Sequence, residues 1–199
     1  MMDFQRKLTS LGLIVFAVTF FLPVGFYNSP LGRFRWSLDA VFLSESPGES
    51  MAFIGICLAI AYPYVWALTS GAIFFFNRSP GSWAIRSQFL CHILGGIPMI
   101  SLGLTLILLK AEFPSASVQW IAVLAPVILW GGLLAIALSM PVRSRFPAMV
   151  ALVLIIFTPI QFVLYHQVSL DGGAGWGFFL GGAGALIGLI GSFVLIFRP

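Results

Sequence analysis

The spacing of the charged residues is the feature that most limits how this chain can fold. Six stretches contain no Asp, Glu, Lys or Arg, and none of them is shorter than 23 residues. A helix that crosses a bilayer needs about 20 apolar residues, because each residue adds about 1.5 Å to its length. The spacing therefore predicts six transmembrane helices. The charge-free stretches are residues 8–32, 50–77, 87–109, 113–142, 146–170 and 172–197.

Local sequence signals place the ends of these helices. Ser46-Pro47-Gly48-Glu49 has the form of a capping box with proline at the first helical position, which predicts the start of the second span. Asp171-Gly172-Gly173 interrupts the chain before the last span. We predict an all-α integral membrane protein, with residues 1–199 forming one six-helix transmembrane domain. The predicted spans are 6–26, 48–76, 88–109, 116–140, 147–166 and 173–197.

The composition excludes the other broad classes. Of the 199 residues, 60% are apolar and 8% are charged, whereas about a quarter of the residues of a soluble domain are charged. A soluble fold cannot cover so much apolar surface. Two cysteines are too few for a disulfide scaffold, and the net charge of +4 is explained by membrane anchoring. We therefore expect the lipid bilayer, and no nucleic acid, as a partner.

The distribution of basic residues predicts the orientation. With the N-terminus inside, seven Lys and Arg residues fall in inner segments and three in outer segments. Cytoplasmic loops of membrane proteins carry this excess of positive charge. We therefore predict that the N-terminus and the C-terminus both lie inside. The outer basic residues are Arg33, Arg35 and Lys110.

The longest segment between predicted spans is the first outer loop, residues 28–50. Phe34, Leu38, Val41 and Phe42 would share one face of a short helix in this loop. Trp36 and two nearby arginines suit a helix that lies in the membrane interface. An ordinary surface loop with a tryptophan at headgroup depth is the alternative.

No group of residues in the sequence indicates catalysis or metal binding. The charge-free spans contain two histidines, His92 and His166, which the topology separates by roughly 25 Å across the membrane. Cys57 and Cys91 are predicted near opposite faces, too far apart for a disulfide. The zinc-protease, serine-hydrolase and phosphate-loop motifs are absent from the sequence. We expect no enzyme activity, no catalytic or metal site and no cofactor.

Prolines occur near the middle of four predicted spans. Each removes a backbone donor and leaves a carbonyl four residues earlier without its usual helical partner. Kinks at similar depth could surround a cavity at the membrane midplane, as in transporters with broken helices. The alternative is that proline is simply common in transmembrane helices. The four positions are Pro63, Pro98, Pro126 and Pro159.

Glycines form a stripe along the last predicted span. They recur at steps of three and four residues, so they share one face of the helix. Small residues in this pattern let a second transmembrane helix approach closely. The sequence leaves open whether that helix belongs to the same chain or to another protein. The predicted packing face is Gly173, Gly177, Gly181, Gly184, Gly188 and Gly191.

These observations favour a non-catalytic membrane protein that acts through helix packing, as a structural or accessory subunit of a larger membrane complex. Its partners would be other membrane protein subunits or further copies of the chain. The alternative is a small transporter or channel for an apolar or uncharged solute that uses the proline-kinked helices. The layout resembles small bacterial multi-pass proteins, which implies the bacterial inner membrane.

Overall fold

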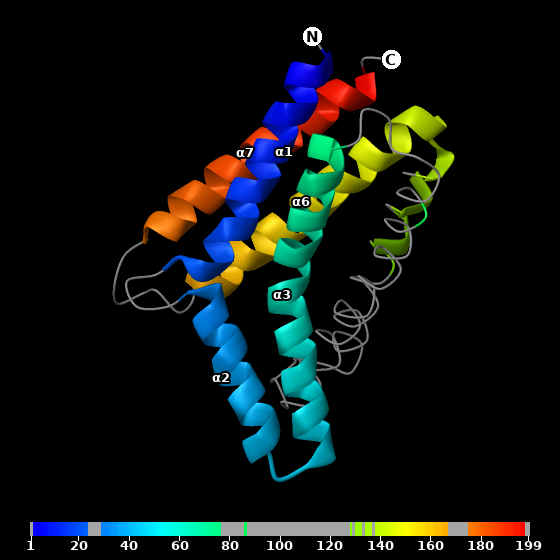
Figure 1. Ribbon diagram of the computed structural model, residues 1–199. Coiled ribbons are helices and arrows are strands. Elements are labelled where there is room, and N and C mark those ends of the chain that lie inside the picture. The colour runs from blue at the N-terminus through cyan, green and yellow to red at the C-terminus, as the bar shows by residue number, and fades with distance from the viewer. Residues whose placement is uncertain are drawn as a thin grey trace.

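The computed structural model describes residues 2–23, 29–76, 86, 128, 130–132, 134–136, 138–166 and 175–197. Every regular element in these ranges is a helix (Figure 1), so the all-helical prediction is confirmed for this part of the chain. The elements are α1 (Met2–Val18), the 3-10 turn η1 (Thr19–Phe21), α2 (Pro30–Leu43), α3 (Pro47–Phe76), α6 (Val142–His166) and α7 (Trp176–Phe197).

Three described helices are long and apolar enough to cross a membrane. They cover Asp3–Phe21, Pro47–Phe76 and Trp176–Phe197, and α6 adds a shorter apolar stretch at Ser144–Ile156. These lengths are compatible with a membrane protein. The predicted span 88–109 lies outside the described residues. Of the span 116–140, only scattered positions from 128 onward are described, and those up to Ser139 are helical.

The end of the first span differs from the prediction. The helix that we expected to reach residue 26 ends at Phe21, after the short turn η1. Leu22 has an extended backbone with φ −94° and ψ 148°. The cause is Pro23, because a proline ring disfavours the helical conformation of the residue before it.

The starts of α2 and α3 follow the same local rule. Ser29 accepts a hydrogen bond from the backbone N–H of Gly32 at 3.0 Å, and Pro30 occupies the first helical turn of α2. Ser46 likewise accepts from the backbone N–H of Glu49 at 3.2 Å, and Pro47 follows it. The predicted start of the second span and the predicted short helix in the outer loop are both confirmed as local structure.

Helix α1 lies between α7 and α3, and the first part of α3 extends beyond the end of α1 (Figure 1). Helices α1 and α7 are antiparallel, and both chain ends lie at the same end of the molecule. Helix α6 packs on α7 and touches α3 through Phe74 and Phe146, whose rings are 4.7 Å apart.

Helix α2 continues beyond the end of α1 and packs along the first half of α3, forming an antiparallel hairpin (Figure 1). On α2, Pro30 and Ser37 are buried, while Leu38 and Phe42 are exposed. Leu38 and Phe42 are four residues apart in this helix and therefore lie on one face of it, as the sequence predicts.

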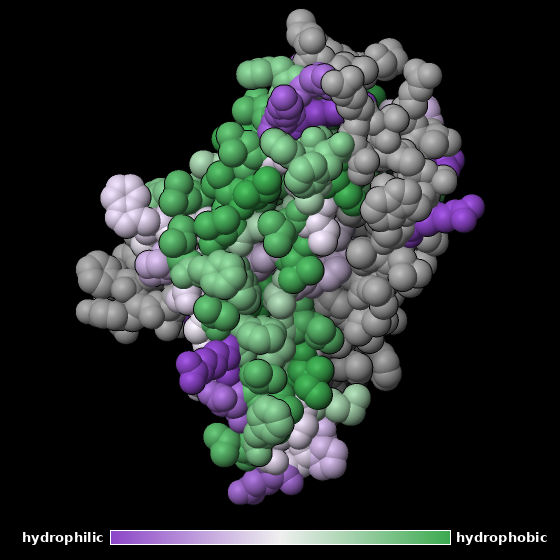
Figure 2. All heavy atoms as spheres, viewed as in Figure 1, coloured by the Kyte–Doolittle hydropathy of each residue, from purple (hydrophilic) through white to green (hydrophobic). Residues whose placement is uncertain are grey.

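Large apolar side chains cover much of the outside of the described helices (Figure 2). On α7, for example, Phe179, Leu186, Ile190 and Phe193 all point away from the bundle. Soluble monomers do not expose apolar patches of this extent. The exterior is compatible with a hydrocarbon surrounding, and hydrophilic atoms form a few separate groups on it (Figure 2).

Candidate functional site

The glycine face of α7 is buried along its whole described length. Gly177, Gly181, Gly184, Gly188 and Gly191 are all buried, whereas bulky residues between them are exposed. Gly173 lies outside the described residues. The face is straight because steps of three and four residues return to the same side of a helix.

Helix α1 of the same chain covers this face, in antiparallel register. Gly181 lies beside Thr19, Gly188 beside Leu13 and Gly191 beside Thr9. At the start of α7, the backbone N–H of Gly177 donates to the carbonyl of Pro23 at 2.9 Å. Of the two alternatives left by the sequence, the structure thus shows an internal contact for the five described glycines.

The two backbones touch where Gly12 of α1 crosses Gly184 of α7. A Cβ on Gly184 would lie 2.7 Å from the backbone nitrogen of Phe16 and 2.8 Å from the carbonyl oxygen of Gly12. A Cβ on Gly12 would lie 2.7 Å from the nitrogen of Gly188 and 2.9 Å from the oxygen of Gly184. Backbone atoms cannot rotate away, so glycine is required on both sides of the crossing.

The half of this interface that α1 and η1 contribute was not predicted from the sequence. Thr9 and Gly12 of α1 and Thr19 of η1 form a matching row of small residues, and both threonines are buried. The signal in the sequence is weak, because only one of the three is glycine and bulky residues stand between them. A search for small residues at helical spacing in every span, threonine included, would have identified the row.

The buried hydroxyl groups of these helices bond to helix backbone. The side chains of Thr9, Thr19 and Ser192 each donate to a carbonyl of their own helix within one turn. The exception is Ser10, whose hydroxyl crosses to α3 and donates to the carbonyl of Gly71 at 2.6 Å. Local bonds of this kind satisfy a hydroxyl in an apolar surrounding without a ligand.

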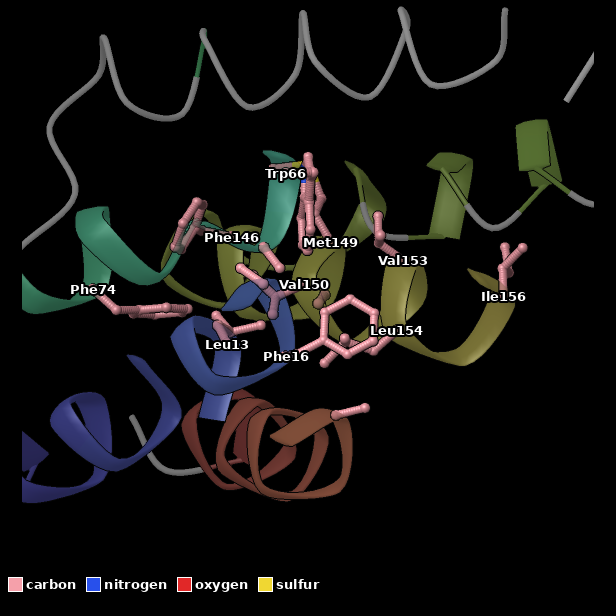
Figure 3. Close-up of a cluster of buried hydrophobic side chains, with 14 of the residues drawn as sticks. Leu13, Phe16, Trp66, Phe74, Phe146, Met149, Val150, Val153, Leu154 and Ile156 are labelled. Carbon is pink, nitrogen blue, oxygen red and sulfur yellow. The ribbon is translucent and has the colours of Figure 1, made fainter. Parts of the chain in front are cut away.

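Apolar side chains fill the space between α1, α3 and α6 (Figure 3). Leu13 and Phe16 of α1 meet Trp66 of α3 and the row Phe146, Met149, Val150, Val153 and Leu154 of α6. Phe16 also stacks on Tyr64, with ring centroids 5.1 Å apart. Close contacts between apolar side chains therefore fill the described interior.

The predicted proline kinks fall partly within the described chain. Pro63 is fully buried in α3, which continues as one helix on both sides of it. Pro159 lies within α6, which also continues to His166. Pro98 and Pro126 lie outside the described residues.

One buried polar atom near these prolines is distinctive. The hydroxyl oxygen of Thr158, just before Pro159, is buried, and no hydrogen-bond partner for it lies in the described part of the chain.

Cys57 is also buried, and its thiol points to the carbonyl of Phe34 at 3.7 Å. Among the described residues, no three His, Cys, Asp or Glu side chains gather as metal ligands.

The comparisons with known proteins add no family. The chain matches no protein-family model, no curated protein and no solved structure.

Proposed function

We propose that this chain is a six-span protein of the bacterial inner membrane and serves as a non-catalytic structural or accessory subunit of a larger membrane complex. One observation carries the proposal. Apart from the hydroxyl of Thr158, the described contacts of the interior are interlocked apolar side chains and hydroxyls bonded to helix backbone, which is typical of a protein that acts through helix packing. Partner contacts then fall on the outer faces of the helices, because α1 already occupies the glycine face.

The positions of the basic residues support the membrane placement. Arg6 and Lys7 precede Ser10, which bonds Gly71 of α3, while Arg33 and Arg35 flank Phe34, which contacts Cys57 of α3. Arg6 and Lys7 lie about one helical turn before the level of Gly71, and Arg33 and Arg35 lie near the level of Cys57. Measured along α3 at 1.5 Å per residue, these two groups of basic residues are about 25 Å apart. The hydrocarbon core is about 30 Å thick, so basic side chains would stand near both of its surfaces.

The inner level also includes the start of α6. Ser144 donates its hydroxyl to the carbonyl of Ile196 at 3.2 Å, and this places Arg145 at the same end as both chain termini. Three described basic residues thus mark one end of the bundle. This grouping supports an orientation with both termini inside.

Purification in a mild detergent tests the proposed role. A subunit should elute with stoichiometric partner proteins, which mass spectrometry would identify, and a lone monomer in several mild detergents would contradict the proposal.

Cysteine labelling in whole cells tests the orientation. In a chain without Cys57 and Cys91, Ser44→Cys should react with an impermeant reagent and Ser79→Cys should not.

A transporter for an uncharged solute is the second candidate, and the buried hydroxyl of Thr158 favours it. A polar atom beside Pro159 that has no hydrogen-bond partner among the described residues, within an apolar helix, suits a site that a solute or a water molecule completes. Uptake of candidate solutes into proteoliposomes tests this function. Transport that Thr158→Val abolishes would support this function with Thr158 in the solute site. Transport that Thr158→Val leaves unchanged would show that the Thr158 hydroxyl does not take part in it.

A further inference from the structure

The hydroxyl group of Thr158 differs in its bonding from other hydroxyls of the described helices. Several serine and threonine side chains donate to the carbonyl of a residue three or four positions earlier, which satisfies the hydroxyl within its own helix. They include Thr9, Thr19, Thr69, Ser139 and Ser192. The hydroxyl oxygen of Thr158 is buried in α6, yet no partner for it lies in the described part of the chain. It is therefore not bonded to a carbonyl of its own helix.

The backbone beside Thr158 contains a second group that lacks its usual partner. Helix α6 continues through Pro159, and proline has no backbone N–H. The carbonyl of Ile155, four residues earlier, therefore lacks the donor that an α-helix normally supplies. Because Thr158 follows Ile155 by three residues, its hydroxyl and this carbonyl lie within one turn of α6. A free donor and a free acceptor are thus close together.

A direct bond between these two groups would satisfy both, and Thr19 shows what that bond looks like. Its buried hydroxyl donates to the carbonyl of Phe16, which is also three residues earlier. Thr158 does not make the corresponding bond to Ile155. A molecule that accepts from the hydroxyl and donates to the carbonyl would satisfy both groups. Ordered water is one of the partners that carbonyls freed by proline find in membrane helices.

The surroundings favour water over a larger polar ligand. Leu154 and Ile156, which flank Ile155, are buried in the apolar cluster (Figure 3). Leu154 and Leu13 of α1 both lie against Gly188 of α7, so three helices meet one turn before Thr158. A buried water needs only about two to four polar partners, and the hydroxyl and the carbonyl supply two. A solute with several polar groups would need more partners than these apolar neighbours provide.

We propose that α6 binds a water molecule that bridges the hydroxyl of Thr158 and the carbonyl of Ile155. The hydroxyl donates to the water oxygen, and the water donates to the carbonyl. Both groups belong to α6, so the bridge does not depend on whether the chain is a subunit or a transporter. For the transport candidate it adds one requirement, because a solute that binds Thr158 must displace this water.

Solid-state NMR of the full chain in lipid bilayers tests the bridge. Magnetisation passes from water protons to carbonyl carbons, and the rate of transfer rises as water comes closer. Isoleucine labelled with ¹³C at the carbonyl and with ¹⁵N gives one bonded carbon–nitrogen pair, because Ile155 and Ile156 are the only adjacent isoleucines in the sequence. The transfer to the carbonyl of Ile155 can therefore be measured by itself.

Two other carbonyls serve as references. Val150–Ala151 and Phe16–Ala17 are the only Val-Ala and Phe-Ala steps in the sequence, so each is also selected by its own pair of labels. The carbonyl of Val150 lies in α6 where residue 154 is a leucine with its N–H present, and it represents a dry helix. The carbonyl of Phe16 represents a direct bond from a threonine hydroxyl.

The proposal expects several-fold faster transfer to Ile155 than to either reference. Thr158→Val should lower the rate to that of Val150, whereas Thr158→Ser, which keeps the hydroxyl, should retain it. Thr69→Val is the matched control, because it removes a hydroxyl bonded to the carbonyl of Trp66, and it should leave the rate at Ile155 unchanged.

Three results would overturn the bridge. A rate at Ile155 equal to that at Phe16 would indicate a direct bond from Thr158. A rate equal to that at Val150 would show that no water is bound, whatever else fills the space. Fast transfer that persists in Thr158→Val would place the water on the carbonyl without the hydroxyl. None of these results measures transport or partner binding, so the proposed functions would be unaffected.

Discussion

Helices α1 and α7 meet through their backbones, whereas α2 and α3 meet through large side chains. The first pair crosses at Gly12 and Gly184, where an added methyl group would collide with main-chain atoms on either side. The second pair uses rings and aliphatic groups, such as the edge-on contact of Trp36 with Phe53. Both pairs are antiparallel, so topology does not account for the difference.

The two helix pairs differ in the interaction that stabilises each contact. Within hydrocarbon, lipid tails are as apolar as leucine, so helices associate by close packing and not by escape from water. Glycine allows that approach because it has no side chain. In the proposed membrane placement, the first turns of α3 lie near water, where the burial of larger apolar groups becomes favourable again. The backbone contact should therefore tolerate substitution far less than the side-chain contact.

The strongest test is Gly184→Leu. Leucine at this position would push against the backbone of α1, so α1 and α7 must separate. We expect a loss of more than about 3 kcal/mol, above the usual range for overpacking, because the obstacle is main chain. The measurement is reversible unfolding in detergent, with Gly132→Leu as control, since Gly132 is exposed and has nothing within 4 Å of its Cβ position. Equal stability of the two variants would refute the crossing.

The same substitution at two phenylalanines compares the regions directly. Phe16 is buried against Tyr64, whereas Phe42 is largely exposed on the hairpin. Phe16→Ala should destabilise the fold by about 3–5 kcal/mol through the cavity it leaves. Phe42→Ala should change the free energy of unfolding by less than about 0.5 kcal/mol, as surface substitutions do. A comparable loss in both variants would show that the hairpin tip is packed against something within the chain.

The hydrogen bond between α1 and α3 should contribute less to the free energy of unfolding than the glycine crossing or Phe16. Ser10→Ala removes the donor to the carbonyl of Gly71, and we expect a loss of about 1 kcal/mol, in the range of interhelical bonds in membranes. Ser139→Ala serves as control, because this exposed hydroxyl donates within its own helix to Ile136. Urea or detergent unfolding compares the two. An effect of Ser139→Ala as large as that of Ser10→Ala would show that the interhelical bond adds nothing of its own.

A small effect, below that of Ser10→Ala, is expected at the aromatic contact of the hairpin. Trp36→Ala removes one edge-on ring pair, and such pairs are worth about 0.5–1.5 kcal/mol. Because 65% of Trp36 is exposed, we expect the lower end of that range. Hydrogen exchange of the α2 amides should rise while that of α7 stays constant. A simultaneous rise in α7 would mean that the hairpin and the glycine crossing fold as one unit.

Much of the local structure could be predicted from the sequence. Ser46 and Pro47 identify the start of α3 to within one residue, and Ser144–Ile156 and Trp176–Phe197 fall within or beside two predicted spans. The end of α1 was missed because hydropathy continues past Phe21, while Pro23 stops the helix through backbone sterics. The glycine face was visible as a pattern, but the row that covers it on α1 was not.

Hydropathy and charge are properties of each residue, so the apolar segments and the charges that end them could be read from the sequence. The flat face of the last helix could be read in the same way. That α1 covers this face and that α2 lies along α3 became visible in the folded chain. Apolar helices resemble one another in hydropathy, and the choice between them depends on fit within a fraction of an ångström, as at Gly12 and Gly184.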